Sequence, residues 1–417
     1  MRKSTGDAIR ARLEHAWFRA SCWAVGLTLV TTLAVLIGRT VIPPEGITPG
    51  YIAFWAAGKL LVSGQSPYDP ALQARIQQQY GWNKATDGLG YWDFLPYYNP
   101  PSLLAPLCVL LVPLGYPTAK IAWLVLNVEL LLLTAYLLRR ALKAIPQWIP
   151  MIVVPFFAFS LFSALTGQVT SLILFLIVAV WRLLQDRWDR SAGWLLAWMT
   201  IKPQLTALFL LGTLLWSARH RRWRVVQSFG IGLLVLLTVS TVIVPSWPIQ
   251  MVQALRETPL ATAERPWVGS TWLLLLRTIG LHGSILWAAY LVAVLPLLLL
   301  LLQSALNPMD ALDEVVALSL LAAFFVAPYA RAYDFPILLI PLLLLLKGRL
   351  PEIWGAFLPF VFLTLPFVHL WWLMTGGSGP YGATGNFMPQ VWLFWIPFFL
   401  TVAWVASRFR NVVEPAG

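Results

Sequence analysis

The chain contains 417 residues, of which 59% are hydrophobic and only 11% are charged, and its mean hydropathy is +0.74. Soluble domains carry about 25% charged residues, whereas apolar runs recur here from residue 18 to residue 407. These values exclude a large soluble domain, and we expect residues 1–417 to form a single polytopic membrane domain. The net charge of +12 does not indicate nucleic-acid binding, because Lys and Arg form short clusters between the apolar runs, as on the cytoplasmic side of membrane proteins.

The first apolar run extends from about Cys22 to Val41 and ends at Pro43 and Pro44 without a small-residue cleavage pattern. We therefore expect a retained transmembrane helix rather than a cleaved signal peptide. The second cysteine, Cys108, also lies in an apolar run. This placement argues against a disulfide framework or a thiolate metal site.

A cytoplasmic N-terminus makes residues 43–100 a long first external segment. We expect the apolar stretch GYIAFWAAGKLLV at its start to lie as a helix at the membrane interface. The aromatic residues of YWDFLPYYNPPS, at 91–102, are typical of an interface belt, although sugar-binding sites share this composition. Transmembrane helices are then expected over 118–138, 146–164 and 169–184, which returns the chain to the basic DRWDR sequence inside.

The next apolar stretch contains a charge and a helix breaker, Lys202 and Pro203. A single straight span would place the following basic sequence, RHRRWR, on the external side. Proline lacks an amide donor and biases the preceding residue away from helical geometry. We therefore expect a broken-helix hairpin over 191–218 whose tip points outward, the alternative being a snorkelling lysine at the end of a kinked helix.

Alternating spans account for the rest of the chain and place both termini in the cytoplasm. We expect them over 225–245, 284–306, 314–328, 335–346, 353–374 and 388–406, with shorter apolar pieces at 101–113 and 267–280. The total is about 12 transmembrane helices or half-helices, which makes the expected fold an all-α integral membrane bundle.

Polar groups without an anchoring role gather on the external side in this threading. They are Asp69, Asp87, Asp93, Gln168, Lys202, Gln204, Arg331 and Asp334. Lys and Arg bind phosphate, and a carboxylate accepts a proton from an attacking hydroxyl, so the set suits a substrate with an anionic head and a lipid tail. Structural alternatives exist for two members. Asp334 with Arg331 is placed to cap the following helix, and Gln168 is placed to cap the helix that begins near residue 169.

Five stretches occur in the order and approximate spacing seen in glycosyltransferase family 87, over roughly residues 20–350. They are FWAAGKLLVSGQSPYD, YYNPPSLLAPLCVLLVPL, TGQVTSLILFLIVAVW, SAGWLLAWMTIKPQL followed by RHRRWR, and APYARAYDFPILLIPL. The chain resembles that family, whose best-known members are polyprenol-phosphate-mannose-dependent mannosyltransferases. The resemblance implies a GT-C fold and inverting transfer of a hexose from a polyprenyl-phosphate sugar to a lipid or glycan acceptor. It also implies an active site at the outer face of the cytoplasmic membrane, with neither a metal nor another cofactor.

The sequence departs from the family at one position. The family usually has an aspartate four residues before the first aromatic of an FW-like pair, and this chain has Gly50 there, in TPGYIAFW. Three interpretations follow: Asp93 or Asp69 replaces the aspartate as base, the acceptor chemistry differs, or the protein is inactive. Asp93 is the favoured base, because its aromatic surroundings would raise its pKa by partial desolvation. The resemblance further assigns Lys202 and Arg331 to the donor phosphate, and Gln168, Gln204 and Asp334 to the sugar or its neighbours.

Two other classes of function fit the same residues. A transporter or flippase for lipid-linked sugars also uses broken helices with a lysine at the break, although no convincing internal repeat is present. The absence of the aspartate at Gly50 favours, as a third class, a non-catalytic protein that binds lipid-linked sugars.

Overall fold

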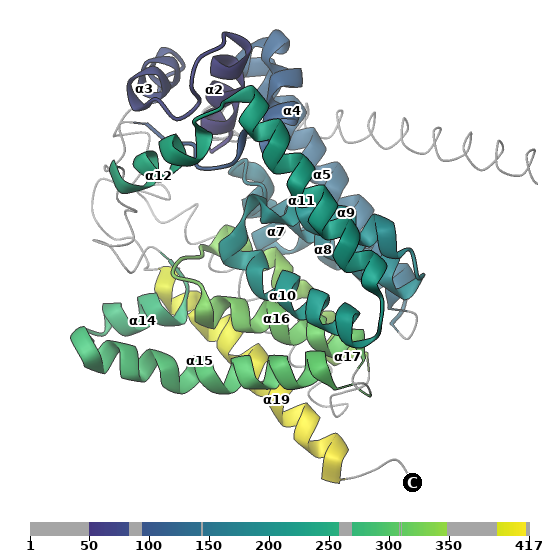
Figure 1. The fold of residues 1–417 in the computed structure, drawn as a ribbon. Helices are drawn as coiled ribbons and strands as arrows, with labels where there is room; N and C mark the ends of the chain where they lie inside the picture. The colour runs from purple at the N-terminus through teal and green to yellow at the C-terminus, as the bar shows by residue number, and fades with distance from the viewer. Residues whose placement is uncertain are drawn as a thin grey trace, which may run out of the picture.

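The computed structural model describes residues 50–82, 94–142, 145–257, 269–307, 309, 311–347 and 390–413. The expected spans at 22–41 and 353–374 lie outside these residues, as do Asp87 and Asp93. All regular structure in the described part of the chain is helical (Figure 1). The α-helices are α2 (Tyr51–Val62), α3 (Pro70–Gln79), α4 (Pro101–Leu111), α5 (Gly115–Ala141), α6 (Trp148–Phe156), α7 (Ala158–Leu165), α8 (Thr170–Gln185), α9 (Asp189–Trp198), α10 (Pro203–Arg219), α11 (Trp223–Ile243), α12 (Trp247–Glu257), α14 (Trp272–Thr278), α15 (Gly283–Leu306), α16 (Leu312–Val326), α17 (Leu339–Leu346) and α19 (Trp395–Val413). Four short 3-10 helices join some of them: η2 (Val112–Leu114), η3 (Met199–Ile201), η5 (Ala332–Leu338) and η6 (Gln390–Phe394).

Four helical segments in the described residues are long and apolar enough to cross a membrane. They are Leu107–Ala141, Trp223–Ile243, Gly283–Leu306 and Gln390–Arg408, and α6 with α7 adds a fifth if the bent pair is one span. The all-α membrane class expected from the sequence is therefore present. The expected number of about 12 elements is not established by these segments.

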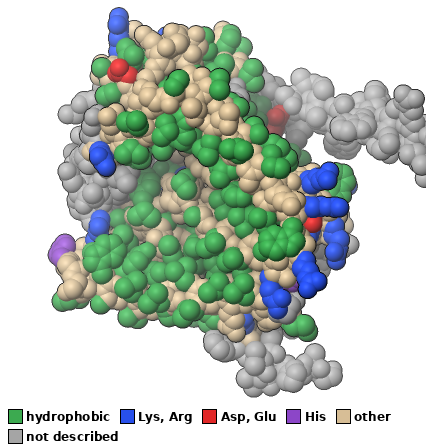
Figure 2. Space-filling view, viewed as in Figure 1, with side chains coloured by type: hydrophobic (Ala, Val, Ile, Leu, Met, Phe, Trp, Pro, Cys, Tyr) green, Lys and Arg blue, Asp and Glu red, His purple; other side chains and the backbone are tan. Residues whose placement is uncertain are grey.

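Hydrophobic length predicted the position of most spans well. Helices α5, α8, α11, α15 and α16 begin and end within three residues of the ranges expected from the sequence. Figure 2 shows that hydrophobic side chains form a broad surface on one face of the molecule. On α15, Leu295 is 50% exposed and Leu299 is 64% exposed, which is the pattern of a lipid-facing helix.

One expected span is bent. The range 146–164 forms two helices, α6 and α7, which meet at 48° with extended backbone at Phe157. Pro155 lies in the last turn of α6 and lacks the amide donor that a continuous helix needs, so the helix breaks directly after it. A second proline, Pro336, lies in the expected span 335–346, whose first part is the 3-10 helix η5 and whose second part is α17.

The chain changes direction at Lys202 and Pro203, where the sequence placed a break. Helix α9 continues into η3, Lys202 leaves helical geometry at φ −138° and ψ 69°, and α10 begins at Pro203. The two helices then have different neighbours, because α9 packs on α8 and α11 while α10 packs on α15 and α16. The location of the break relative to the membrane stays a prediction.

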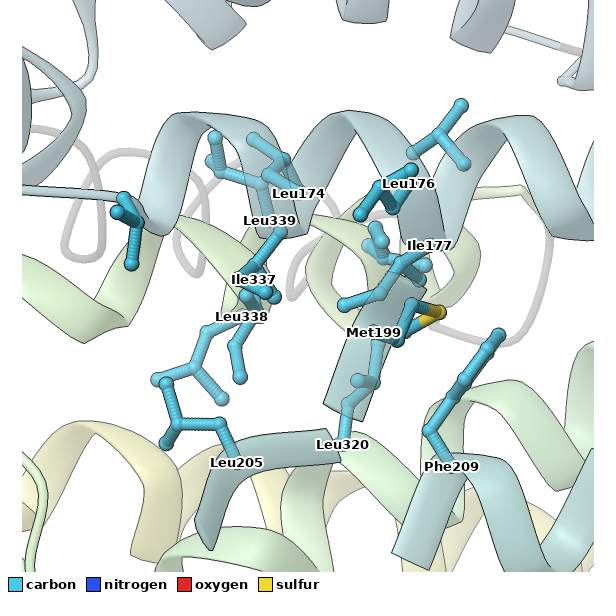
Figure 3. Packing of buried hydrophobic residues seen from close by; sticks show 14 of the residues in the cluster. Leu174, Leu176, Ile177, Met199, Leu205, Phe209, Leu320, Ile337, Leu338 and Leu339 are labelled. Atoms are coloured by element: carbon cyan, nitrogen blue, oxygen red, sulfur yellow. The ribbon is translucent and has the colours of Figure 1, made fainter. Parts of the chain in front are cut away.

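A buried apolar cluster surrounds this break. Figure 3 shows Leu174 and Ile177 of α8, Met199 of η3, and Leu205 and Phe209 of α10 packed around it. The same view places Ile337, Leu338 and Leu339, from the junction of η5 and α17, beside α8. Elements far apart in the sequence therefore pack on one core. The polar residues at the ends of these elements are thereby brought close together.

Helix α2, in the expected first external segment, packs on α3, α4 and α5 and buries Tyr51, Ile52, Trp55 and Leu60. Its location at the membrane interface stays a prediction. Its close approach to α4 depends on Gly58, because a Cβ there would lie 2.9 Å from Cys108 Cβ.

The most extensive helix pairing joins α9 and α11 through small residues. A Cβ on Gly193 would press on the carbonyl oxygen of Val225 and lie 2.7 Å from Ser228 Cβ. A Cβ on Gly232 would lie 3.0 Å from Ala197 Cβ. Small residues spaced four apart let helix backbones approach closely in a membrane, and this pair uses that arrangement.

Replacement of Gly193 by alanine is expected to lower the free energy of unfolding by about 1–3 kcal/mol, because the added methyl meets backbone that cannot yield. Gly230→Ala is the matched control, since a Cβ at Gly230 on α11 meets nothing within 4 Å. Thermal unfolding of the purified protein in mild detergent measures both. Equal midpoints for the two variants would show that the α9–α11 contact is looser than described.

Candidate active site

Three segments of the chain meet at the carboxylate of Asp334. Its Oδ1 forms an ion pair with Lys202 Nζ and accepts a hydrogen bond from Thr170 Oγ1 at 3.0 Å. Its Oδ2 accepts from the backbone N–H of Arg331 at 3.0 Å. Asp334 is fully buried and Lys202 is only 8% exposed. The two opposite charges therefore have to be buried together, since either alone would carry a large desolvation penalty.

The ends of two helices also favour a negative charge at this place. Thr170 is the first residue of α8, and Lys202 directly precedes the first residue of α10. Unpaired amide groups and the helix dipole make a helix N-terminus electropositive. The break at Lys202 and Pro203 thus creates a second N-terminus beside that of α8, and the lysine adds a full positive charge.

The loop that carries Arg331 and Asp334 is anchored on both sides. Ser270 N donates to Ala330 O at 2.8 Å, and Ser270 Oγ donates to Gln390 O at 2.6 Å. The Gln390 side chain also accepts from the backbone N–H of Ala332 at 3.3 Å. The segment before α14 and the start of η6 therefore hold the loop in position.

Tyrosine rings line the loop next to the cations. Lys202 Nζ lies 4.9 Å from the ring centroid of Tyr333, and the Arg331 guanidinium carbon lies 5.6 Å from that of Tyr329. The two tyrosine hydroxyls are 3.0 Å apart and share a hydrogen bond. Aromatic faces attract cations, so the tyrosines help to keep both basic side chains at this loop.

Gly50 lies against the turn that leads into α8. Its N–H donates to Thr166 O at 3.0 Å, and a Cβ at residue 50 would lie 2.7 Å from that oxygen and 2.6 Å from Gln168 Nε2. The turn itself is a helix C-terminal motif with Gly167 at φ 73°. The place of the expected aspartate is therefore filled by Gln168 and backbone, and the carboxylate of an aspartate there does not fit without movement of this turn.

Aromatic and hydrogen-bonding contacts connect α2 and the residues before α4 to the same turn. Tyr51 stacks on Trp123 with ring centroids 4.8 Å apart, and the Trp123 indole donates to Gly167 O at 3.0 Å. Tyr97 packs edge-on against Phe54. The end of the segment nearest Asp93 is therefore attached to the wall that contains Gly50 and Gln168.

Two further contacts fix the backbone that follows residue 93. The Gln77 side chain donates to Leu95 O and accepts from Leu95 N. Tyr68 donates its hydroxyl to Asn99 O at 2.7 Å, and burial raises the pKa of Tyr68 above its ordinary value, so that it remains a donor. Asp93 itself lies outside the described residues.

The other expected site residues divide between the site and its surroundings. Asp69 accepts from Leu72 N at 3.0 Å and is the N-cap of α3, which Figure 1 shows at the edge of the molecule, away from α8 and α10. Gln204 lies two residues after Lys202 and is half-buried. Gln168 does not cap α8, because the N-cap residue is Val169.

Asp334 has the capping role that the sequence offered, because its side chain accepts the Arg331 amide at the start of η5, but its ion-pair partner is Lys202. Its role toward the sugar stays a prediction. Thr170, Tyr333 and Gln390 were not singled out from the sequence. Thr170 and Tyr333 lie inside the TGQVTS and YARAYD stretches, which was the one available signal for them.

A model of glycosyltransferase family 87 matches residues 97–329, more than half of the chain. The protein belongs to glycosyltransferase family 87. It is therefore a glycosyltransferase by family, and its apolar spans make it a membrane protein. The matched region contains Gln168, Thr170 and Lys202 and ends two residues before Arg331. No curated protein and no solved structure matches the chain.

Loss of one partner of the buried pair is expected to destabilise this glycosyltransferase strongly. Asp334→Asn leaves Lys202 without its counter-charge, and Lys202→Met does the same to Asp334, so each should lower the free energy of unfolding by about 3–5 kcal/mol. The double variant Lys202→Met/Asp334→Asn should lose far less than the sum. Thermal unfolding of all four proteins measures the coupling. Additive losses would show that the two side chains do not act as a pair.

Proposed function

We propose that this family 87 protein transfers a hexose, with mannose the first choice, from a polyprenyl-phosphate sugar to a lipid or glycan acceptor. The reaction takes place at the outer face of the cytoplasmic membrane, inverts the sugar and uses no metal. The observation that carries the proposal is the buried Lys202 at the adjoining N-termini of α8 and α10, inside the matched region. Helix N-termini and a lysine together form a binding place for phosphate.

In the resting protein this place is occupied by a carboxylate. Because Asp334 neutralises Lys202, a donor phosphate gains only the difference between its own contacts and those of Asp334. Arg331, half-buried beside the tyrosines, supplies the second positive charge. The proposal assigns Gln168, Gln204 and Asp334 to the sugar and its neighbours.

Transfer requires a base that takes the proton of the acceptor hydroxyl. That oxygen attacks the anomeric carbon, the bond from this carbon to the phosphate oxygen breaks, and polyprenyl phosphate leaves with the electron pair. Gly50 cannot act as the base, and Asp69 already caps α3. The proposal therefore assigns this role to Asp93, which directly precedes the described residues 94–100 in the sequence.

Asparagine substitutions separate the two aspartates. Asp93→Asn should reduce transfer by a factor of about 10²–10⁴, the usual contribution of general base catalysis. Asp69→Asn is the matched control, because asparagine caps a helix as well as aspartate does, so stability and turnover should stay near wild type. The assay is mass spectrometry of protein reconstituted in lipid with a panel of polyprenyl-phosphate sugars.

The same assay distinguishes the alternatives. Unchanged turnover by Asp93→Asn would refute the base assignment but leave the transferase intact. Donor binding without turnover by the wild type would favour a non-catalytic binder. Movement of an intact donor between leaflets, without release of polyprenyl phosphate, would favour a flippase, for which the broken helix at Lys202 is the supporting observation.

A further inference from the structure

Two turns at one end of the helical bundle share an unusual backbone. The turn between α8 and α9 has Arg187 at φ 61°, and the turn between α10 and α11 has Arg221 at φ 57°. In both, the residue after the arginine donates its N–H to a carbonyl five residues earlier, at 2.8 Å. These are the only non-glycine residues of the described chain with positive φ. Glycine is the usual residue at such a position, so each turn keeps an arginine where the backbone favours glycine.

A third arginine fixes the two turns together. Arg222 forms an ion pair with Asp189 at the start of α9 and donates to Leu184 O, near the end of α8, at 2.9 Å. Its guanidinium carbon lies 5.4 Å from the Trp216 ring centroid. The close α9–α11 crossing at Gly193 continues directly from this contact. The turns therefore present their remaining side chains from a rigid platform.

An open hollow of about 300 Å³ lies on this platform. It is lined by Arg187, Trp188, Asp189, Arg190, Ser191 and Arg224. The carboxylates nearby already have partners, since Asp189 pairs with Arg222, and Asp186 pairs with Arg182 at 2.7 Å. In the part of the chain that the structure describes, Arg187, Arg190 and Arg224 pair with no carboxylate, so the hollow has an excess of positive charge.

One exposed tryptophan lines the hollow, and a second is adjacent in sequence to a lining residue. Trp188 is 65% exposed and lines it, and Trp223, next to Arg224, is 55% exposed. Figure 2 shows Lys and Arg side chains gathered along one margin of the broad hydrophobic face. Tryptophan prefers the level of the lipid headgroups, so this margin is placed where phospholipid phosphates lie.

We propose that the hollow binds the phosphate of an anionic phospholipid headgroup. Arginine forks match phosphate oxygens in geometry as well as charge, and three of them converge here around one cavity. The tryptophan rings pack against the adjoining glycerol and the first part of the acyl chains. Anionic headgroups are preferred over zwitterionic ones, because the latter bring a positive amine close to the arginines.

A pair of glycine substitutions tests this site without loss of the fold. Arg187→Gly and Arg221→Gly remove the same charge from the same backbone conformation, but only Arg187 lines the hollow. Both variants should unfold at or above the wild-type temperature, because glycine is unstrained at positive φ. Native mass spectrometry of the full chain in neutral detergent, titrated with short-chain phosphatidylglycerol or phosphatidylcholine, measures the binding.

We expect phosphatidylglycerol to bind more tightly than phosphatidylcholine of the same chain length. Arg187→Gly should weaken this binding about tenfold, the effect of one lost charge-assisted contact, whereas Arg221→Gly should leave it near wild type. Equal weakening by both variants would mean diffuse attraction, and equal affinity for both lipids would mean acyl-chain binding alone. Displacement of phosphatidylglycerol by an equal concentration of inorganic phosphate would mean a site for free anions. Any of these three results overturns the proposal.

Discussion

The buried ion pair between Lys202 and Asp334 is the constraint on which this structure depends. Neither charge is tolerated alone in an apolar interior, so the beginning of α8, the break before α10 and the first turn of η5 have to come together around the pair. The break at Pro203 contributes to this arrangement, because it places the electropositive N-terminus of α10 near the negative carboxylate. The surrounding apolar side chains of Leu174, Leu205 and Leu338 exclude water and so strengthen the attraction between the two charges. In the proposed function, recognition of the donor phosphate is an exchange of anions at Lys202 rather than the filling of an empty cationic pocket.

The segment from α2 to α4 reaches this region through a series of side-chain contacts. Tyr51, Trp123 and Gly167 join α2 to α5 and to the turn before α8, while Gln77 and Tyr68 hold the backbone near Leu95 and Asn99. The family match covers residues 97–329, so it contains α4 to α16 but not α2, α17, α19 or Asp334.

Several features were predictable from the sequence because they depend on local physics. Hydrophobic length predicted the positions of helices α5, α8, α11, α15 and α16, and the rules for proline predicted the break at Pro203. The bend after Pro155 follows from the same rule but was not expected, because the run 146–164 has the length of a single span. The partner of Lys202 was not predictable, since Asp334 is 132 residues away and its local signal indicated a helix cap. Burial of α2 was also missed, because its sequence is equally apolar on a lipid surface and in a protein interior. The role of Asp93 as the base and the number of membrane crossings stay predictions.

The close contact between Gly50 and Gln168 implies that these two positions do not vary independently. A glycine at residue 50 leaves a space that the glutamine amide and the Thr166 carbonyl fill. An aspartate at this place would require either movement of the Gln168 side chain or a different path for the turn. Relatives that contain both an aspartate and a glutamine at these positions would be expected to carry a compensating insertion or deletion in the turn between α7 and α8.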